Sequence, residues 1–168
     1  MRSSAVRTTL AVLTLAAGGA GAALVGAAPA AASGYKMSQG AAQSRLSANG
    51  ISSYSSGNCS ARNNPSCTSF DQINSGTIDG VVTLRGASGC QIVITGGTET
   101  GHASGTYSHW NGYKVDIRTS TTTTTCIDRY IRANFAFIGN RGDGAPQYRS
   151  GSGNIYANEG THWDVLYY

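Results

Sequence analysis

Charged side chains are scarce in this chain of 168 residues, because Asp, Glu, Lys and Arg together make up only 12% of it. The formal net charge is +4 at pH 7. This positive charge is small and evenly spread, whereas a nucleic-acid-binding surface needs clustered Lys and Arg. We therefore expect no nucleic-acid partner. A weak, non-specific attraction to an anionic cell wall remains compatible with the charge.

A second long apolar run is also absent, since the only one lies near the start of the chain. Residues 1–32 have the pattern of a secretory signal peptide: Arg2 and Arg7 precede an apolar run, and Ala30-Ala31-Ala32 forms a cleavage motif. A membrane anchor is the alternative, but the run is rich in Ala and Gly rather than Leu and Ile. The chain has no Arg-Arg pair, so we expect general secretion rather than the twin-arginine route. We expect a secreted, extracellular monomer that has no membrane contact after cleavage, with residues 33–168 forming one domain.

Cysteine is limited to four residues, and no Cys-x-x-Cys pair occurs among them. The missing pair disfavours a thiolate zinc site. An even number of cysteines in an exported chain instead predicts disulfides, for which three pairings are possible. We favour Cys59 with Cys67, which would close a tight loop, and Cys90 with Cys126.

Helical and strand patterns alternate along residues 33–168. Helices are expected over 38–48 and 126–133, and the segment 77–88 fits either a helix or a buried strand. Strands are expected over 90–95, 112–118, 135–138, 154–158 and 162–167. Segments rich in Ser, Thr, Asn or Gly are expected to be loops or turns, and these are 53–69, 120–125 and 140–152.

Ionisable residues gather in two short stretches, SHWNGYKVDI from position 108 and EGTHWDV from position 159, although the chain has only three His and eight Asp plus Glu. His109, Asp116 and His162 match the three imidazole and carboxylate ligands of a catalytic zinc site, which leaves a fourth position for water. Glu159, three residues before His162, could take the proton from that water. Either His109 or Asp116 alone is more often a solvated or hydrogen-bonded loop residue, but the scarcity of such groups favours a metal site.

The pattern His-x-x-Gly-x-x-x-Asp, followed by Glu-x-x-His-Trp, resembles the zinc peptidases of the D-alanyl-D-alanine carboxypeptidase and dipeptidase group, a family that includes phage endolysins. The run IVITGG at 92–97 is similar to the strand that leads into the family's site, so the resemblance covers about 77–168. It implies zinc ligands at His109, Asp116 and His162 and a general base at Glu159. It also favours a helix over 77–88.

Together with the predicted elements, the resemblance implies an α+β fold. A small antiparallel sheet would carry the zinc site, a few helices would pack on it, and two disulfides would hold it. The implied activity is the hydrolysis of peptide bonds in peptidoglycan stem peptides, as a carboxypeptidase or an endolysin-like endopeptidase. Zn²⁺ would be the cofactor, and Glu159 would act as general base for a zinc-bound water.

One feature of the family is missing. The strand before its site ends in a turn whose Arg binds the substrate, but Gly96-Gly97-Thr98-Glu99 stands here. Another cation must then stabilise the oxyanion, and the candidates are Arg85, Lys114 and Arg118.

Aromatic residues flank the expected ligands and could line a substrate groove or pack in the core: Tyr107, Trp110, Tyr113 and Trp163. Substrate contacts are expected from Tyr107, Arg85, Arg118 and Trp163. His102, on a Gly- and Thr-rich loop, fits a fourth ligand, a substrate contact or a solvent-exposed side chain.

Two other classes of protein stay open. A non-catalytic, secreted cell-wall or carbohydrate-binding module would use its aromatic side chains and would bind polymer without zinc. An inactive zinc-binding scaffold on the same fold would bind zinc and cleave no peptide.

Overall fold

The computed structural model of the protein describes residues 34–119 and 125–168. The expected signal peptide lies outside the described residues, as do positions 120–124 of the expected Thr-rich loop. Within the described part, no helix is both long and apolar enough to cross a membrane.

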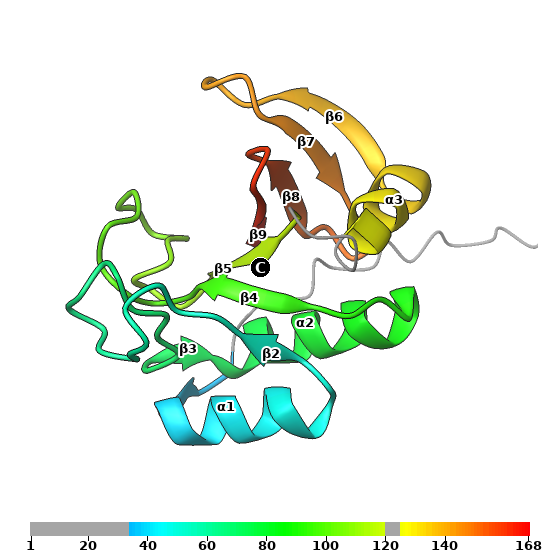
Figure 1. Cartoon of the computed structure of the whole chain (residues 1–168). Coiled ribbons are helices and arrows are strands. Elements are labelled where there is room, and N and C mark those ends of the chain that lie inside the picture. Colours follow the sequence, from blue (N-terminus) through cyan, green and yellow to red (C-terminus); the bar gives the residue numbers. More distant parts are fainter. Residues whose placement is uncertain (1–33, 120–124) are drawn as a thin grey trace, which may run out of the picture.

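The described chain is a mixed α/β structure that contains three helices (Figure 1). The helices are α1 (Gln39–Ala48), α2 (Ser75–Ser88) and α3 (Thr125–Asn134). The strands are β1 (Lys36–Met37), β2 (Ser52–Ser53), β3 (Ile73–Asn74), β4 (Val93–Gly96), β5 (Lys114–Arg118), β6 (Ala136–Asn140), β7 (Pro146–Arg149), β8 (Ile155–Asn158) and β9 (His162–Leu166).

The main sheet has seven strands in the order β2-β4-β5-β9-β8-β7-β6. All of its neighbouring strands are antiparallel except β2 and β4, which run parallel. A separate pair, β1 and β3, is also antiparallel. The predicted mixture of helices and a sheet is therefore confirmed, but the prediction of a small sheet is wrong, because the sheet has seven strands.

The sheet is larger partly because β7 lies in the segment 140–152, which was expected to be turn. β7 pairs with both β6 and β8. Its residues are partly or fully exposed, so the strand carries no apolar alternation that a sequence pattern can detect. The glycines that suggested turns flank β7, and Gly144 and Gly153 indeed have positive φ values of 90° and 92°.

The helix predictions are confirmed. The side chain of Ser38 accepts a hydrogen bond from the Ala41 N–H at the start of α1, which is the usual N-cap contact. α2 begins at Ser75 and ends at Ser88, and the φ of 65° at the following Gly89 is the left-handed conformation typical of a helix C-terminus. α3 covers the third predicted helix, and the five predicted strands overlap β4, β5, β6, β8 and β9.

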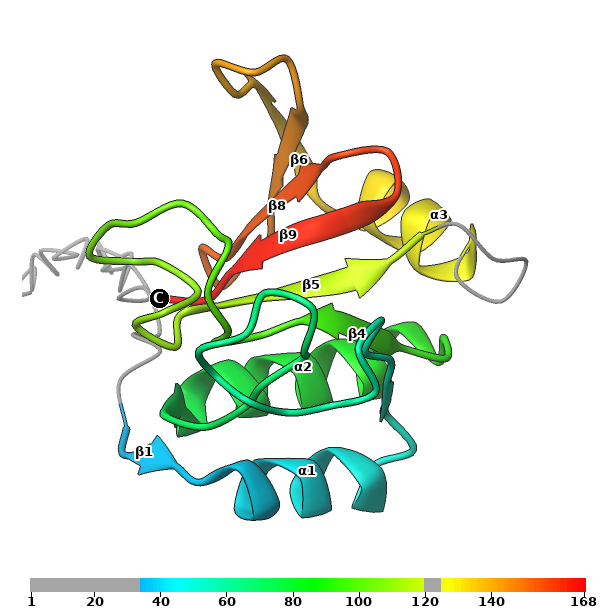
Figure 2. The same cartoon turned by 60° about the vertical axis from the view of Figure 1, so that its left-hand side comes forward.

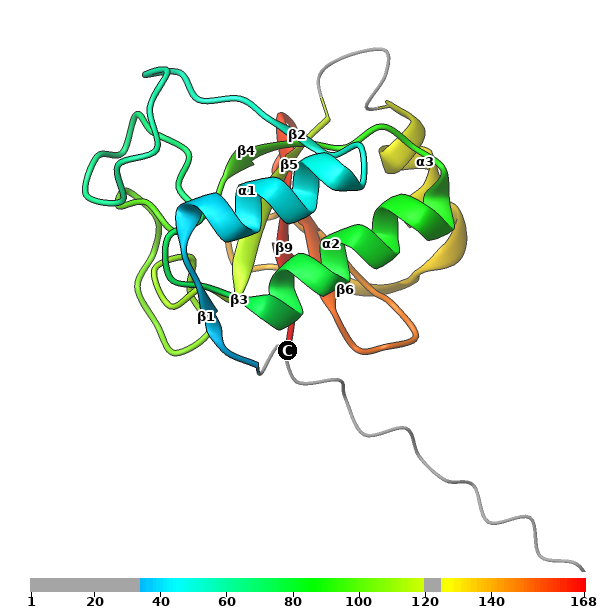
Figure 3. The same ribbon diagram turned by 90° about the horizontal axis from the view of Figure 1, so that it is seen from below.

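The core lies between the sheet and the helices. Seen from below, α1 and α2 lie side by side across the strands (Figure 3). Ile78 and Val81 of α2 share one buried apolar cluster with Val115 and Ile117 of β5 and with Trp163 of β9. Each such side chain contributes about 1.5–3 kcal/mol when fully buried. Because successive strand residues point to opposite faces, the residues between these core positions point away from the core.

Both predicted disulfides are confirmed. Cys59 and Cys67, 8 residues apart, close a loop. Cys90 and Cys126, 36 residues apart, tie the segment before β4 to the first turn of α3. Disulfides of this kind are typical of an oxidising, extracellular environment.

Candidate metal centre

Two adjacent strands, β5 and β9, carry ionisable residues on the face opposite the core. Asp116 of β5 is the direct cross-strand partner of Asp164 of β9, and Arg118 is the partner of His162. These four residues alternate with the buried Val115, Ile117 and Trp163. Figure 2 shows β5 and β9 as neighbouring strands. The sheet therefore supports two carboxylates and one imidazole on rigid backbone.

His109 reaches these carboxylates from the loop before β5. Its Nδ1 lies 2.8 Å from the carbonyl oxygen of Gly97. A carbonyl oxygen only accepts, so Nδ1 carries the proton and Nε2 presents its lone pair in the neutral ring. That Nε2 lies 3.4 Å from Asp116 Oδ1 and 3.5 Å from Asp164 Oδ1.

Glycine at position 112 is what allows this loop to form. Gly112 has a φ of +76°, and a Cβ there would stand 2.6 Å from the carbonyl oxygen of Gln72. The glycine of the His-x-x-Gly-x-x-x-Asp pattern therefore has a structural reason, because any other residue would push the loop and His109 out of place.

His162 and Glu159 complete the expected set. The Nε2 atom of His162 lies 3.6 Å from Asp116 Oδ1 and 3.2 Å from Glu159 Oε2. Its Nδ1 is 3.0 Å from Thr161 Oγ1. The structure thus places both expected histidine ligands next to the expected carboxylate ligand, Asp116, and the expected base next to His162.

His102 is part of the same group. Its ring stacks on the ring of His109, with centroids 3.8 Å apart and planes within 13°. Its Nδ1 lies 3.8 Å from Asp116 Oδ2. Ligand atoms of His102, His109 and Asp116 all lie within 4.8 Å of one another, so this group can hold a metal ion.

Two buried oxygens indicate that a cation fits here. Asp116 Oδ1 and Asp164 Oδ1 are both buried, and neither has a hydrogen-bond partner among the described residues. Burying a charge without a partner is costly, and a cation placed between these oxygens and the imidazole lone pairs would remove that cost. Gly96 provides the space, since a Cβ there would lie 2.3 Å from Asp116 Oδ2. Imidazole and carboxylate ligands suit zinc and related divalent ions.

The two aspartates differ in their electrostatics. Burial raises the pKa of Asp116, although His109 and His162 oppose this rise. Burial acts in the same direction on Asp164, but His109 and Lys114 outweigh it and hold the pKa of Asp164 well below its usual range. Asp164 thus favours the ionised form, whereas the ionised form of Asp116 is disfavoured without a further positive charge.

Arg141 joins this site and was missed by the sequence analysis. Its Nη1 donates to Asp164 Oδ2 at 2.8 Å, and its Nη2 donates to Glu159 Oε1. Lys114 donates to the same Asp164 oxygen at 2.7 Å. Arg141 comes from the turn after β6, far from the ligands in sequence, so no local pattern indicates it. Asp164, by contrast, could have been found, because it lies two residues after His162 on a predicted strand.

Of the expected substrate contacts, Arg118 lies at the site. It lines a pocket of about 310 Å³ together with His102 and His162, and its guanidinium stands 4.4 Å from the ring centre of Tyr54. Tyr107 is 50% exposed and packs edge-on against two other tyrosines.

The other two expected contacts do not reach the site. Trp163 is 0% exposed and lies in the core, where its ring packs against Tyr148. Arg85 lies in the last turn of α2, beside Gly50. Neither side chain is therefore available to a substrate at the metal centre.

Comparison of this chain with protein-family models, with curated proteins and with solved structures found no match. The resemblance to zinc peptidases therefore rests on the sequence motifs alone.

Proposed function

We propose that this protein is a secreted, zinc-dependent peptidase that hydrolyses peptide bonds in peptidoglycan stem peptides, with residues 33–168 as its peptidase domain. The observation that carries the proposal is that the Nε2 atoms of His109 and His162 lie 3.4 and 3.6 Å from Asp116 Oδ1, with Glu159 beside His162. These are the residues that the family pattern assigns to the ligands and the base.

The ligand set fits the chemistry of peptide hydrolysis. A bound zinc ion supplies Lewis acidity, which makes water a stronger nucleophile near neutral pH and polarises a carbonyl group. His109, Asp116 and His162 would hold it. Asp164 adds a negative charge at the same place, with its Oδ1 3.5 Å from His109 Nε2.

Glu159 would act as the general base. Its Oε2 lies 3.2 Å from His162 Nε2, and its Oε1 accepts a hydrogen bond from Arg141. In the proposed reaction Oε2 accepts a proton from the attacking water and then delivers it to the leaving amine. General acid-base catalysis of this kind contributes typically about 10²–10⁴-fold in rate.

Arg118 is the best placed cation for the substrate. Within the described residues it forms no ion pair, and its guanidinium lies over Tyr54 in the pocket that it shares with His102 and His162. Lys114 and Arg141 are both committed to Asp164. Arg118 therefore remains free to bind a substrate carbonyl or carboxylate, in the role that the family gives to an Arg of the preceding turn.

The proposal is tested on purified protein with both disulfides formed. Bound metal is measured by elemental analysis, and released amines are scored on purified peptidoglycan. We expect one zinc per chain, and a loss of about 10²–10⁴-fold in cleavage rate for Glu159→Gln without loss of zinc. Asp79→Asn, which removes an acid from the exposed side of α2, is the matched control and should cleave like wild type.

Each other outcome would assign this protein to a different functional class. Zinc without cleavage in the wild type would make it an inactive metal-binding scaffold. Peptidoglycan binding that survives removal of all metal, again without cleavage, would make it a cell-wall binding module. If the protein binds no stoichiometric metal, the assignment of the metal site is wrong.

A further inference from the structure

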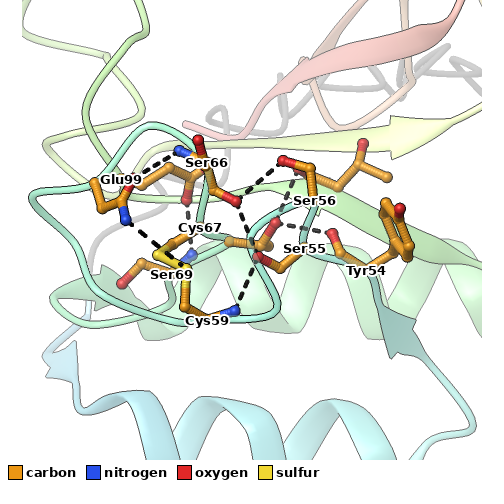
Figure 4. The surroundings of a disulfide bond; sticks show 11 residues. Tyr54, Ser55, Ser56, Cys59, Ser66, Cys67, Ser69 and Glu99 are labelled. Carbon is orange, nitrogen blue, oxygen red and sulfur yellow. Dashed lines mark hydrogen bonds between the residues drawn. A yellow bond between two sulfur atoms is a disulfide. The ribbon is translucent and has the colours of Figure 1, made fainter.

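Glu99 is a buried carboxylate whose position is fixed by backbone groups. Its side chain is only 3% exposed. Its Oε2 accepts a hydrogen bond from the Ser69 N–H at 2.7 Å, and both of its oxygens lie 3.1 Å from the Gly97 nitrogen. Figure 4 shows Glu99 beside Ser69, next to the loop that the Cys59–Cys67 disulfide closes. A carboxylate held by several backbone N–H groups is rigid and stays ionised.

This carboxylate sets the tautomer of His102. The Nε2 atom of His102 lies 3.1 Å from Glu99 Oε1. Because an ionised carboxylate only accepts hydrogen bonds, Nε2 carries the proton, and Nδ1 of the neutral ring is left with its lone pair. That Nδ1 faces Asp116 Oδ2 at 3.8 Å. Two acceptors that face each other in this way leave room for a cation and favour its binding.

In all three histidines of the chain, one ring nitrogen (the outer nitrogen) contacts a neighbouring group and the other (the inner nitrogen) lies near Asp116. The outer ring nitrogens of His102, His109 and His162 contact Glu99, the Gly97 carbonyl and the Thr161 hydroxyl, respectively. Their inner nitrogens lie 3.8, 3.4 and 3.6 Å from the oxygens of Asp116. Metal-binding histidines usually donate their second N–H to a carboxylate or a carbonyl, which orients the ring.

We propose that His102 is a fourth protein ligand of the metal centre, and that Glu99 is the positioning residue that holds it there. The centre then has three imidazoles and one carboxylate, instead of the two imidazoles and one carboxylate implied by the family resemblance. Gly97 connects the two halves of this arrangement, because its N–H binds Glu99 while its carbonyl accepts from His109.

The number of imidazole ligands can be counted directly, since the chain contains only three His. The metal-free protein is loaded with ¹¹³Cd²⁺, which takes the same nitrogen and oxygen ligands, and ¹H–¹¹³Cd correlation spectra are recorded. Each imidazole bound to cadmium gives its own correlations to ring protons. We expect correlations from three imidazoles in the wild type and from two in His102→Ala.

Glu99→Gln tests the positioning role. The amide keeps the size of the side chain but removes the negative charge that fixes the His102 proton. Loss of an outer carboxylate typically weakens metal binding by about 10–100-fold, and we expect a zinc dissociation constant raised by that factor. The ¹⁵N shifts of the His102 ring should also show a change of tautomer. Asp79→Asn removes a charge elsewhere and should change neither quantity.

Two results would overturn the proposal: correlations from only two imidazoles in the wild-type protein, or unchanged cadmium spectra in His102→Ala. If Glu99→Gln fails to fold, the cadmium spectra of His102→Ala alone test whether His102 is a ligand. The inference rests on the metal site of the proposed function, but the cadmium spectra need no peptidase activity. Three bound imidazoles without any cleavage would support the assignment of His102 as a ligand and contradict the peptidase function. Cleavage with only two bound imidazoles would support the peptidase function and contradict the assignment of His102.

Discussion

Asp116 and Asp164 stand directly opposite each other on the neighbouring strands β5 and β9, and both are buried. Like charges in directly opposed positions destabilise a sheet. Asp164 is balanced by Lys114 and Arg141, which both bind its Oδ2. Asp116 has no Lys or Arg partner and faces only imidazoles. The pair is therefore best explained as a site for a cation.

Replacing Asp116 should have opposite effects on the stability of the metal-free protein and on its stabilisation by zinc. Because burial raises the pKa of Asp116, its ionised form costs free energy in the metal-free protein. Asp116→Asn should therefore raise the free energy of unfolding when chelator is present. Zinc at about 100 times its dissociation constant should stabilise the wild type by about 2.7 kcal/mol, but should not stabilise the variant.

Thermal unfolding with chelator and with zinc measures both effects. Asp79→Asn is the control, and it should respond to zinc like the wild type. An equal rise in Tm on adding zinc to Asp116→Asn would contradict the assignment of Asp116 as a ligand.

Arg141 should matter for turnover more than for substrate binding. It holds Glu159 through one nitrogen and Asp164 through another. A hydrogen bond between charged groups contributes about 1.5–3 kcal/mol, so Arg141→Ala should lower kcat by about 10–100-fold and leave KM nearly unchanged. Added guanidinium ion should restore part of the activity.

The comparison variant for Arg141 is Arg45→Ala, which removes an arginine that pairs with Asp79 between α1 and α2. Its kcat should match the wild type and should not respond to guanidinium. A variant Arg141→Ala with normal kcat would show that Glu159 needs no such support.

Arg118 and Arg85 form a matched pair for substrate binding. Arg118 lines the pocket beside His102 and His162, whereas Arg85 lies on α2, beside Gly50. If Arg118 binds a charged or polar substrate group, Arg118→Ala should raise KM by about 10–100-fold, and Arg85→Ala should leave it unchanged. Steady-state kinetics on a synthetic stem peptide distinguishes them, and equal KM values in the two variants would remove Arg118 from the substrate site.

Tyr156 should make the protein sensitive to alkaline pH. Burial raises the pKa of Tyr156 from 10.0 to about 12 in the folded state. Below pH 10 both states keep the proton and the stability is complete. Between about pH 10 and 12 the unfolded state loses the proton first, so the free energy of unfolding falls by up to about 1.4 kcal/mol per pH unit.

Urea unfolding at pH 9, 10 and 11 tests this prediction. Tyr156→Phe, which has no proton to lose there, should show a shallower decline above pH 10. Tyr35→Phe changes a tyrosine that is 66% exposed and should decline like the wild type. Parallel curves for the wild type and Tyr156→Phe would refute the role of Tyr156.

Local sequence patterns were sufficient for much of the fold. Patterns that act over a few residues predicted the helices α1 and α3, whereas the segment 77–88 fitted a helix or a strand, and only the family resemblance favoured the helix α2. The strand that carries Asp116 was also predictable. β7 was not, because its partly exposed residues acquire strand geometry only from pairing with β6 and β8.

Glu99 illustrates what a pattern misses. It occupies the place where the resembled family has a turn that ends in Arg, so the sequence indicated only an absence there. Its partners, Ser69 and His102, come from the disulfide-closed segment and from a glycine-rich loop. No periodicity connects these segments.

By itself, the sequence determined most of the longer elements, the pair of disulfides and a short list of ionisable residues in motifs, since these depend on neighbours in the chain and on residue type. Only the tertiary structure decided that Trp163 belongs to the core, that Arg141 belongs to the site, and that His102 stacks on His109. The physical reason is that strand pairing sets Asp116 opposite Asp164 and gathers loops from distant positions around them. Burial, tautomer and charge balance exist only once those segments are in contact.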